Sequence, residues 1–111
     1  MEPKFNLWLE KDGQVVLSAW RVSLLQAIED SGSISAAAEK LGIPYRRAWQ
    51  KVHEMEKRLG AALLETSVGG AGGGGARLTE AARHEIARFE QFGKGISEIV
   101  EERFRATYGS R

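Results

Sequence analysis

The sequence predicts a mainly α-helical fold with a small β component, and three observations indicate it. Apolar residues recur at steps of three or four in several segments between residues 18 and 104. Gly42, Ile43 and Pro44 connect two of these segments, and a connection of this length and chemistry is typical of the turn in a helix-turn-helix. A glycine tract at residues 69–75 lies between two strand-like segments, as in a wing. We therefore predict a single winged helix-turn-helix domain over residues 1–111.

Composition limits the class of protein. The 111 residues are 42% hydrophobic and 28% charged, which is ordinary for one globular domain. No run approaches the roughly 18 apolar residues of a membrane helix, and the amino terminus lacks the features of a signal peptide, so we expect a cytoplasmic protein without a membrane partner. The chain has no cysteine, and His53 and His84 are too far apart in sequence to form a local metal pair. We expect no bound metal.

The amino-terminal segment predicts a β-hairpin over residues 5–17. Apolar and polar residues alternate from Phe5 to Leu9, and an apolar run resumes at Val15. Asp12 and Gly13 stand between these segments, and both residue types tolerate the positive φ of a tight hairpin turn.

The next segments predict three helices, the last two forming a helix-turn-helix over residues 33–59. The first helix begins after Ser18 and ends near Gly32. Ser33 is placed to cap the second through the backbone N–H of Ser35 or Ala36, and that helix ends at Gly42. The third starts at Pro44, and its inward stripe consists of Ala48, Val52, Met55 and Leu59.

The opposite face of the third helix carries Arg46, Gln50 and Lys57. Although the chain has a net charge of only +1, no acidic residue lies between Ile43 and His53, where Arg46, Arg47 and Lys51 are all basic. Such a segment fits a nucleic-acid contact surface, although three cations at helical spacing are also typical of a solvated helix face.

Residues 62–78 predict the wing. Six of the seven residues from Gly69 to Gly75 are glycine, so we expect a mobile loop there, with an uncommitted linker as the alternative. The tract also matches the G-x-G-x-x-G spelling of a dinucleotide site. No second parallel strand and no acidic ribose ligand follow it, so we expect neither a nucleotide cofactor nor an enzyme.

The carboxy-terminal segment predicts a long helix over residues 80–104. Its apolar stripe is larger than so small a domain can cover, so we expect a two-fold homodimer, with burial inside the monomer as the alternative. Gly93 and Gly95 predict a kink or a close helix crossing at this point of the helix. The predicted dimerisation residues are Ile86, Phe89, Phe92, Ile96, Ile99 and Val100.

Several motifs carry a resemblance to a known family. The segments Ser31–Ala38, Gly42–Trp49 and Gly69–Thr79 resemble the DNA-binding domain of ModE-type molybdate-responsive regulators. Met55–Gly60 and Leu78–Ala81 are similar to the broader LysR-type winged helix. The resemblance implies a dimeric bacterial transcription factor whose recognition helices enter successive major grooves of a palindromic operator.

The chain departs from the family in three respects. Relatives commonly have a hydroxyl residue in place of Pro44 and a basic residue in place of Thr66, so a helix cap and a phosphate contact are expected to be missing. The family senses molybdate through carboxy-terminal domains, and nothing after Phe104 resembles them. We therefore expect no cofactor, and an unknown effector or partner protein in either a single-domain relative or a fragment of a longer regulator.

Each candidate residue has an expected role. We assign base contacts to Arg46, Arg47 and Gln50, each worth about 1–3 kcal/mol of discrimination if bidentate. Phosphate contacts fall to Ser33, Ser35, Tyr45, Lys51 and, at the base of the wing, Arg77.

The tryptophans and His53 receive the remaining assignments. Trp49 is predicted either to lie in the core or to flank the DNA groove, whereas Trp8 and Trp20 are assigned to packing and His53 to a solvated helix face. A winged-helix module that serves only protein–protein assembly remains the alternative function.

Overall fold

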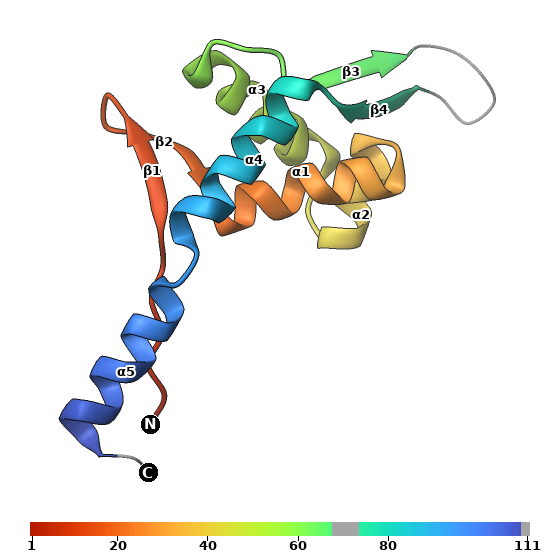
Figure 1. Ribbon diagram of the computed structural model, residues 1–111. Helices are drawn as coiled ribbons and strands as arrows, with labels where there is room; N and C mark the ends of the chain where they lie inside the picture. Colours follow the sequence, from red (N-terminus) through yellow and green to blue (C-terminus); the bar gives the residue numbers. More distant parts are fainter. Residues whose placement is uncertain (68–73, 110–111) are drawn as a thin grey trace.

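The computed structural model describes residues 1–67 and 74–109, and it is mainly helical with two small β-hairpins (Figure 1). This architecture confirms the predicted fold class. The elements in chain order are β1 (Trp8–Lys11), β2 (Gln14–Ser18), α1 (Ala19–Ser31), α2 (Ile34–Leu41), α3 (Tyr45–Leu59), β3 (Leu64–Ser67), β4 (Gly75–Leu78), α4 (Glu80–Gly93) and α5 (Ile96–Tyr108).

Strands β1 and β2 form the predicted amino-terminal hairpin. They pair antiparallel, with Lys11 opposite Gln14 at the turn. Asp12 and Gly13 have φ values of 54° and 78°, the positive φ at both central residues that a two-residue hairpin turn of the matching twist requires. The Asp-Gly signal in the sequence therefore placed this turn correctly.

Local capping defines the helices of the helix-turn-helix. The hydroxyl of Ser33 accepts a hydrogen bond from the backbone N–H of Ala36, one of the two partners expected for it. Gly42 ends α2 with a φ of 70°, a conformation that costs little only for glycine. Pro44 precedes α3 and makes no side-chain capping bond, so the cap expected to be missing is missing.

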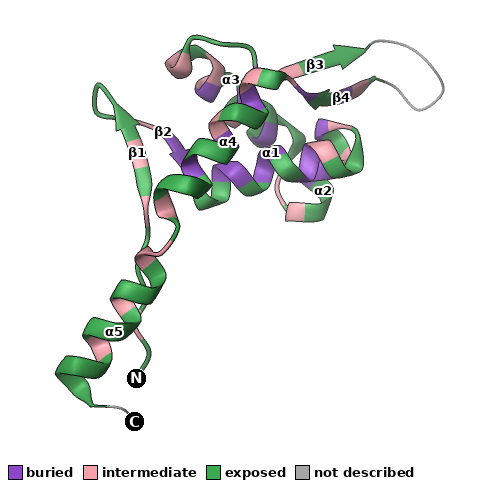
Figure 2. Cartoon of the chain, in the orientation of Figure 1, coloured by how far each residue is buried: buried purple, intermediate pink, exposed green. Residues whose placement is uncertain are grey.

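The core lies between α1, α2, α3, α4 and the roots of the two hairpins (Figure 2). Ala48, Val52 and Met55 of α3 are each 0% exposed, which confirms the inward stripe, and Leu59 is partly buried at its end. They pack with the buried face of α1, which includes Leu24, Leu25 and Ile28. The outer face of α3 is consequently fixed relative to the rest of the domain.

Strands β3 and β4 pair antiparallel from Leu64 opposite Leu78 to Ser67 opposite Gly75. The backbone N–H of Ala76 donates to the Gly32 carbonyl oxygen at 2.7 Å, and that of Leu78 donates to the Glu29 carboxylate at 2.8 Å. These bonds hold the base of the wing against the end of α1. The glycine tract that was expected to be mobile spans residues 69–75. Residues 68–73 lie outside the described residues, and Gly75 is the first residue of β4.

The carboxy-terminal helical region is present and is divided into α4 and α5. Gly95 has a φ of 87° at the junction, which is the kink that its sequence predicted. Ile86 and Phe89 of α4 are only 7% and 8% exposed and belong to the core of the monomer. Their assignment to the dimer surface is therefore wrong, because α4 packs against β4 and the core while α5 extends away from the body.

Two tryptophans differ from their expected positions. Trp8 and Trp20 were assigned to packing, yet both are among the exposed large hydrophobic residues. Trp8 lies on the exposed side of β1, where its indole N–H donates to the Glu10 carboxylate at 2.9 Å. Trp20 lies in the first turn of α1, at the edge of the face that Leu24 and Leu25 bury.

Candidate nucleic-acid interface

The first half of α3 presents an exposed basic and amide surface. Arg46, Arg47 and Gln50 are all exposed on the outer face of the helix. Within residues 1–67 and 74–109, none of these side chains makes an ion pair or hydrogen bond. Their donors, and the amide oxygen of Gln50, are therefore available to a ligand. The positive end of the helix dipole lies at the same place and adds to the attraction for an anionic partner.

The shoulder of α3 carries a compact ion cluster centred on Glu54. One carboxylate oxygen of Glu54 lies 3.3 Å from the guanidinium of Arg21, 3.7 Å from Lys51 Nζ and 3.7 Å from Arg58. Arg21 is buried and also donates to the Lys51 carbonyl oxygen. The predicted phosphate ligand Lys51 thus has an acidic neighbour in the protein, unlike Arg46 and Arg47.

The charges around Glu54 determine its protonation. Partial burial by itself raises the pKa of Glu54, but the hydrogen bond from Arg21 and the charges of Lys51 and Arg58 outweigh it and lower the pKa. Glu54 is therefore ionised at neutral pH and compensates the buried guanidinium of Arg21. Arg21 was not identified from the sequence, because its partner Glu54 lies 33 residues away along the chain.

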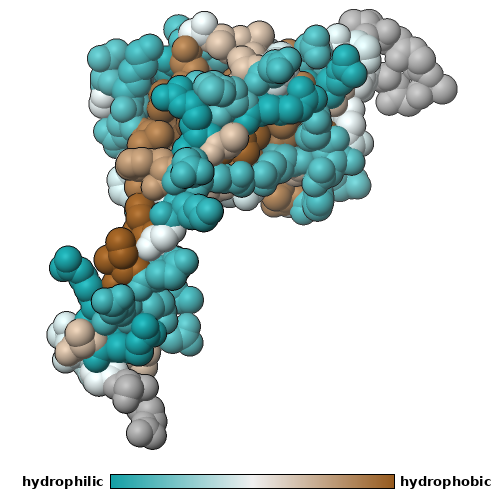
Figure 3. Space-filling view, viewed as in Figure 1, coloured by the Kyte–Doolittle hydropathy of each residue, from teal (hydrophilic) through white to brown (hydrophobic). Residues whose placement is uncertain are grey.

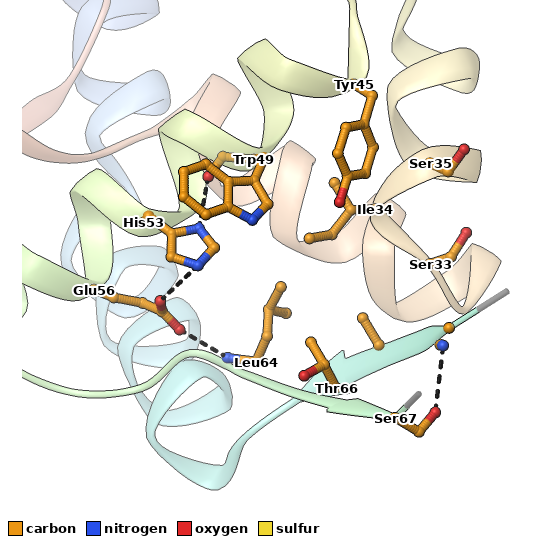
Figure 4. A pocket seen from close by; sticks show the side chains of 13 residues that line it. Ser33, Ile34, Ser35, Tyr45, Trp49, His53, Glu56, Leu64, Thr66 and Ser67 are labelled. Carbon is orange, nitrogen blue, oxygen red and sulfur yellow. Dashed lines mark hydrogen bonds and ion pairs between the residues drawn. The ribbon is translucent and has the colours of Figure 1, made fainter. Parts of the chain in front are cut away.

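A cleft of about 570 Å³ separates α3 from the wing (Figure 4). The amino end of α2 contributes Ser33 and Ser35, α3 contributes Tyr45, Trp49 and His53, and the two wing strands close the other side. Four residues that were predicted to contact DNA thus lie around one cleft, namely Ser33, Ser35, Tyr45 and Trp49. The capping role of Ser33 leaves its hydroxyl hydrogen free to be donated.

Trp49 flanks this cleft and does not lie in the core. Its indole is 43% exposed and stacks on the His53 ring with centroids 3.8 Å apart and planes 22° apart. Nδ1 of His53 donates to the Trp49 carbonyl oxygen at 2.8 Å, which orients the imidazole. His53 is exposed, as expected, and its ring lies between the indole and Glu56, as Figure 4 shows.

Glu56 connects α3 to the wing and was not singled out from the sequence. One of its carboxylate oxygens accepts hydrogen bonds from the backbone N–H groups of Leu63 and Leu64, at 2.8 and 3.3 Å. The other oxygen lies 3.9 Å from His53 Nε2. A single side chain therefore contacts both the first residues of the wing and the ring that supports Trp49.

Arg77 lies on the wing opposite Glu65. Its Nε is 3.4 Å from a Glu65 carboxylate oxygen, and both side chains are exposed. The exposure leaves Arg77 accessible, but the cross-strand pair compensates part of its charge.

No other type of site stands out among the described residues. Within residues 1–67 and 74–109, no group of three or more acidic or histidine side chains is arranged to hold a metal ion. In the same ranges, no helix combines the length and apolar character that crossing a bilayer requires.

Several known proteins are similar in sequence. The molybdenum-pterin-binding protein MopB of Rhodobacter capsulatus is 40% identical over 92 residues, which are 83% of this chain and 34% of that protein. The DNA-binding transcriptional dual regulator ModE of Escherichia coli K12 is 37% identical over 90 residues, 81% of this chain and 34% of that protein. The chain therefore spans about a third of the length of these curated relatives.

Two solved structures share the fold. The crystal structure of a CbnR_DBD-DNA complex matches with a TM-score of 0.57 and 21% identity, over 80% of this chain and 95% of that one. The crystal structure of ArgP from Mycobacterium tuberculosis matches with a TM-score of 0.53 and 24% identity, over 74% of this chain and 29% of that one.

A family model also matches residues 21–83, which run from α1 through the helix-turn-helix and the wing into α4. It describes the bacterial regulatory helix-turn-helix proteins of the lysR family. Together with the relatives named ModE, this match confirms the resemblance identified from the sequence. The chain belongs to the lysR family of bacterial regulatory helix-turn-helix proteins.

Proposed function

We propose that this chain is the DNA-binding unit of a transcriptional regulator and binds double-stranded DNA in a sequence-specific manner. The observation that carries the proposal is the outer face of α3, where Arg46, Arg47 and Gln50 are exposed and the described residues offer them no partner. Membership of a regulatory helix-turn-helix family and the DNA-binding relative in Escherichia coli support it. Residues 1–111 act as one such unit.

The exposed side chains divide into two sets of DNA contacts. Arg46, Arg47 and Gln50 enter the major groove, where arginine pairs with guanine and glutamine with adenine. Ser33, Ser35, Tyr45, Lys51 and Arg77 contact phosphates and fix the orientation of the protein. Lys51 and Arg77 contribute less than their charge implies, because Glu54 and Glu65 already pair with them.

The chain binds its operator as a two-fold dimer. Phe92 and Ile99 are exposed, and Ile96 and Val100 are half-buried, along the end of α4 and the start of α5. Figure 3 shows apolar side chains continuing from the body toward α5. A second copy that covers this surface places two α3 helices in a symmetric arrangement, and a symmetric protein selects a palindromic site.

Selection of bound fragments from random duplex DNA tests the proposal, and an inverted repeat is the expected result. On that sequence Arg46→Ala weakens binding by about 5- to 150-fold, the equivalent of 1–3 kcal/mol for one base contact, but changes binding to random DNA far less. Lys57→Ala is the matched control, since it removes a charge from the same face at the other end of α3. Equal losses on both DNAs would exclude base contact by Arg46.

The exposed apolar surface of α5 also favours a second function, protein–protein assembly without specific DNA binding. Ionic strength separates the two. Binding to DNA through about six phosphates falls by roughly 10³-fold between 50 and 200 mM salt, whereas an apolar interface does not lose affinity in this range.

A further inference from the structure

Two aromatic rings are exposed on the DNA-facing side of α3. Tyr45 is 53% exposed and Trp49 is 43% exposed, one helical turn further along. With Arg46 and Gln50 they line an open notch of about 400 Å³ on the helix surface. The two rings give the notch apolar walls on an otherwise polar face of the helix.

The notch is rigid on its Trp49 side. The indole stacks on His53, whose ring is fixed by the Trp49 carbonyl oxygen and lies next to Glu56. Glu56 is in turn fixed by two backbone N–H groups of the segment that leads into β3. A wall that is already held in place loses little conformational entropy when it contacts a ligand.

The position of the notch determines which ligand group reaches it. It lies between Arg46 and Gln50, the two side chains that contact base edges in the proposed function. In the major groove the bases present donors, acceptors and one apolar group, the C5-methyl of thymine. The faces of the Tyr45 and Trp49 rings offer no hydrogen bond to a polar base edge, but they can bury a methyl group.

We propose that the notch between Tyr45 and Trp49 binds the C5-methyl group of a thymine, which makes Trp49 a specificity-determining residue of the DNA contact. This inference rests on the proposed function and adds to it. The ring of Tyr45 forms one wall of the notch, and its phenol hydroxyl remains free to reach a phosphate.

Deoxyuridine tests the inference, because it differs from thymidine by this methyl group alone. Each thymine of the selected operator is replaced in turn, and binding is measured by fluorescence anisotropy. At one thymine in each half-site we expect the unmodified protein to lose about three- to fourfold in affinity, the effect of burying one methyl group. Trp49→Ala binds the thymine operator more weakly and no longer distinguishes it from the deoxyuridine operator.

Two controls keep the test specific. Trp49 is exposed, so Trp49→Ala retains the fold, and thermal unfolding verifies this. Lys57→Ala retains the preference for thymine over deoxyuridine, because Lys57 does not line the notch.

The outcomes distinguish the inference from the function beneath it. If specific binding is found but no thymine is sensitive, or Trp49→Ala remains as sensitive as the unmodified protein, the inference is overturned and the proposed function stands. Equal weakening of Trp49→Ala on thymine, deoxyuridine and random DNA also overturns it, because the ring then contacts the sugar–phosphate backbone. If selection recovers no preferred sequence, the proposed function fails, and the inference fails with it.

Discussion

The helix-turn-helix body and the arm formed by α5 contain similar side chains but bury them very differently. In the body, Leu24, Val52 and Met55 are 0% exposed, whereas α5 has no buried residue although Ile96, Ile99 and Val100 lie along it. The arm extends a molecule that measures 58 × 28 × 22 Å (Figure 2). Isolated helices of about 12–15 residues are marginal in water. The body therefore has its own core within one chain, whereas the arm would be covered only by the second copy proposed above.

The largest expected effect comes from removing a core side chain of the body. Met55→Ala lowers the free energy of unfolding by about 2–5 kcal/mol, because it leaves a cavity in a fully packed site. Urea denaturation at low protein concentration measures it. Ile99→Ala is the matched change in the arm and shifts the same quantity by less than about 0.5 kcal/mol in the monomer. Similar losses for both variants would contradict the distinction between body and arm.

When association is measured instead of unfolding, a change in α5 has the large effect. Ile99→Asp places a carboxylate in the proposed dimer surface in both copies, so we expect the dimer dissociation constant to rise by at least about 100-fold. Sedimentation equilibrium measures the constant. Ser97→Asp adds the same charge to α5 outside the apolar stripe and leaves association nearly unchanged. An Ile99→Asp protein that still dimerises normally would place the interface elsewhere.

Features that depend on neighbouring residues in the chain could be predicted from the sequence. The helix ends at Ser33 and Gly42, the turn at Asp12 and the inward stripe of α3 depend on residues close together in the chain, and all were predictable. The exposed position of Arg46 follows from that stripe, because helical geometry places it on the opposite side.

Contacts between distant segments could not be predicted. The pair of Arg21 with Glu54 and the bonds from Glu56 to the wing depend on how α1, α3 and β3 are packed. The apolar stripe of residues 80–104 is continuous in sequence, and only the packing of α4 on the body assigns Ile86 to the core and leaves Ile99 exposed. Periodicity identifies an apolar face but does not say which chain covers it.

The ion cluster on α3 makes the stability of the body depend on acid. Because the pKa of Glu54 is lowered on folding, its stabilisation is present above its ordinary pKa of 4.5 and is lost as pH falls through the lowered value. At neutral pH Glu54→Gln reduces stability by about 1–3 kcal/mol, since Arg21 loses a charged hydrogen-bond partner.

Urea denaturation between pH 7 and pH 3 measures this effect. Glu54→Gln loses less stability in acid than the unmodified protein does. Some dependence on acid remains, because the pKa of Glu29 is also lowered, mainly by the Leu78 N–H and by Arg83. If the stability of Glu54→Gln falls with pH as steeply as that of the unmodified protein, Glu54 does not contribute to the acid dependence.

The two glycines at the junction give the smallest expected effects, of opposite sign in the two regions. Gly95 has a φ of 87°, so Gly95→Ala introduces a strain of about 1 kcal/mol. In a monomer α5 can move and relieve this strain, so monomer stability does not change. In the proposed dimer α5 is fixed, so we expect the dimer to be roughly fivefold weaker. Gly93 ends α4, and a Cβ there meets Leu7 at an ordinary 3.4 Å. Gly93→Ala therefore stabilises the body by about 0.4–1 kcal/mol. A loss of body stability in Gly95→Ala would show that the junction is rigid in a single chain. In that case α5 would belong to the monomer fold and not to a dimer interface.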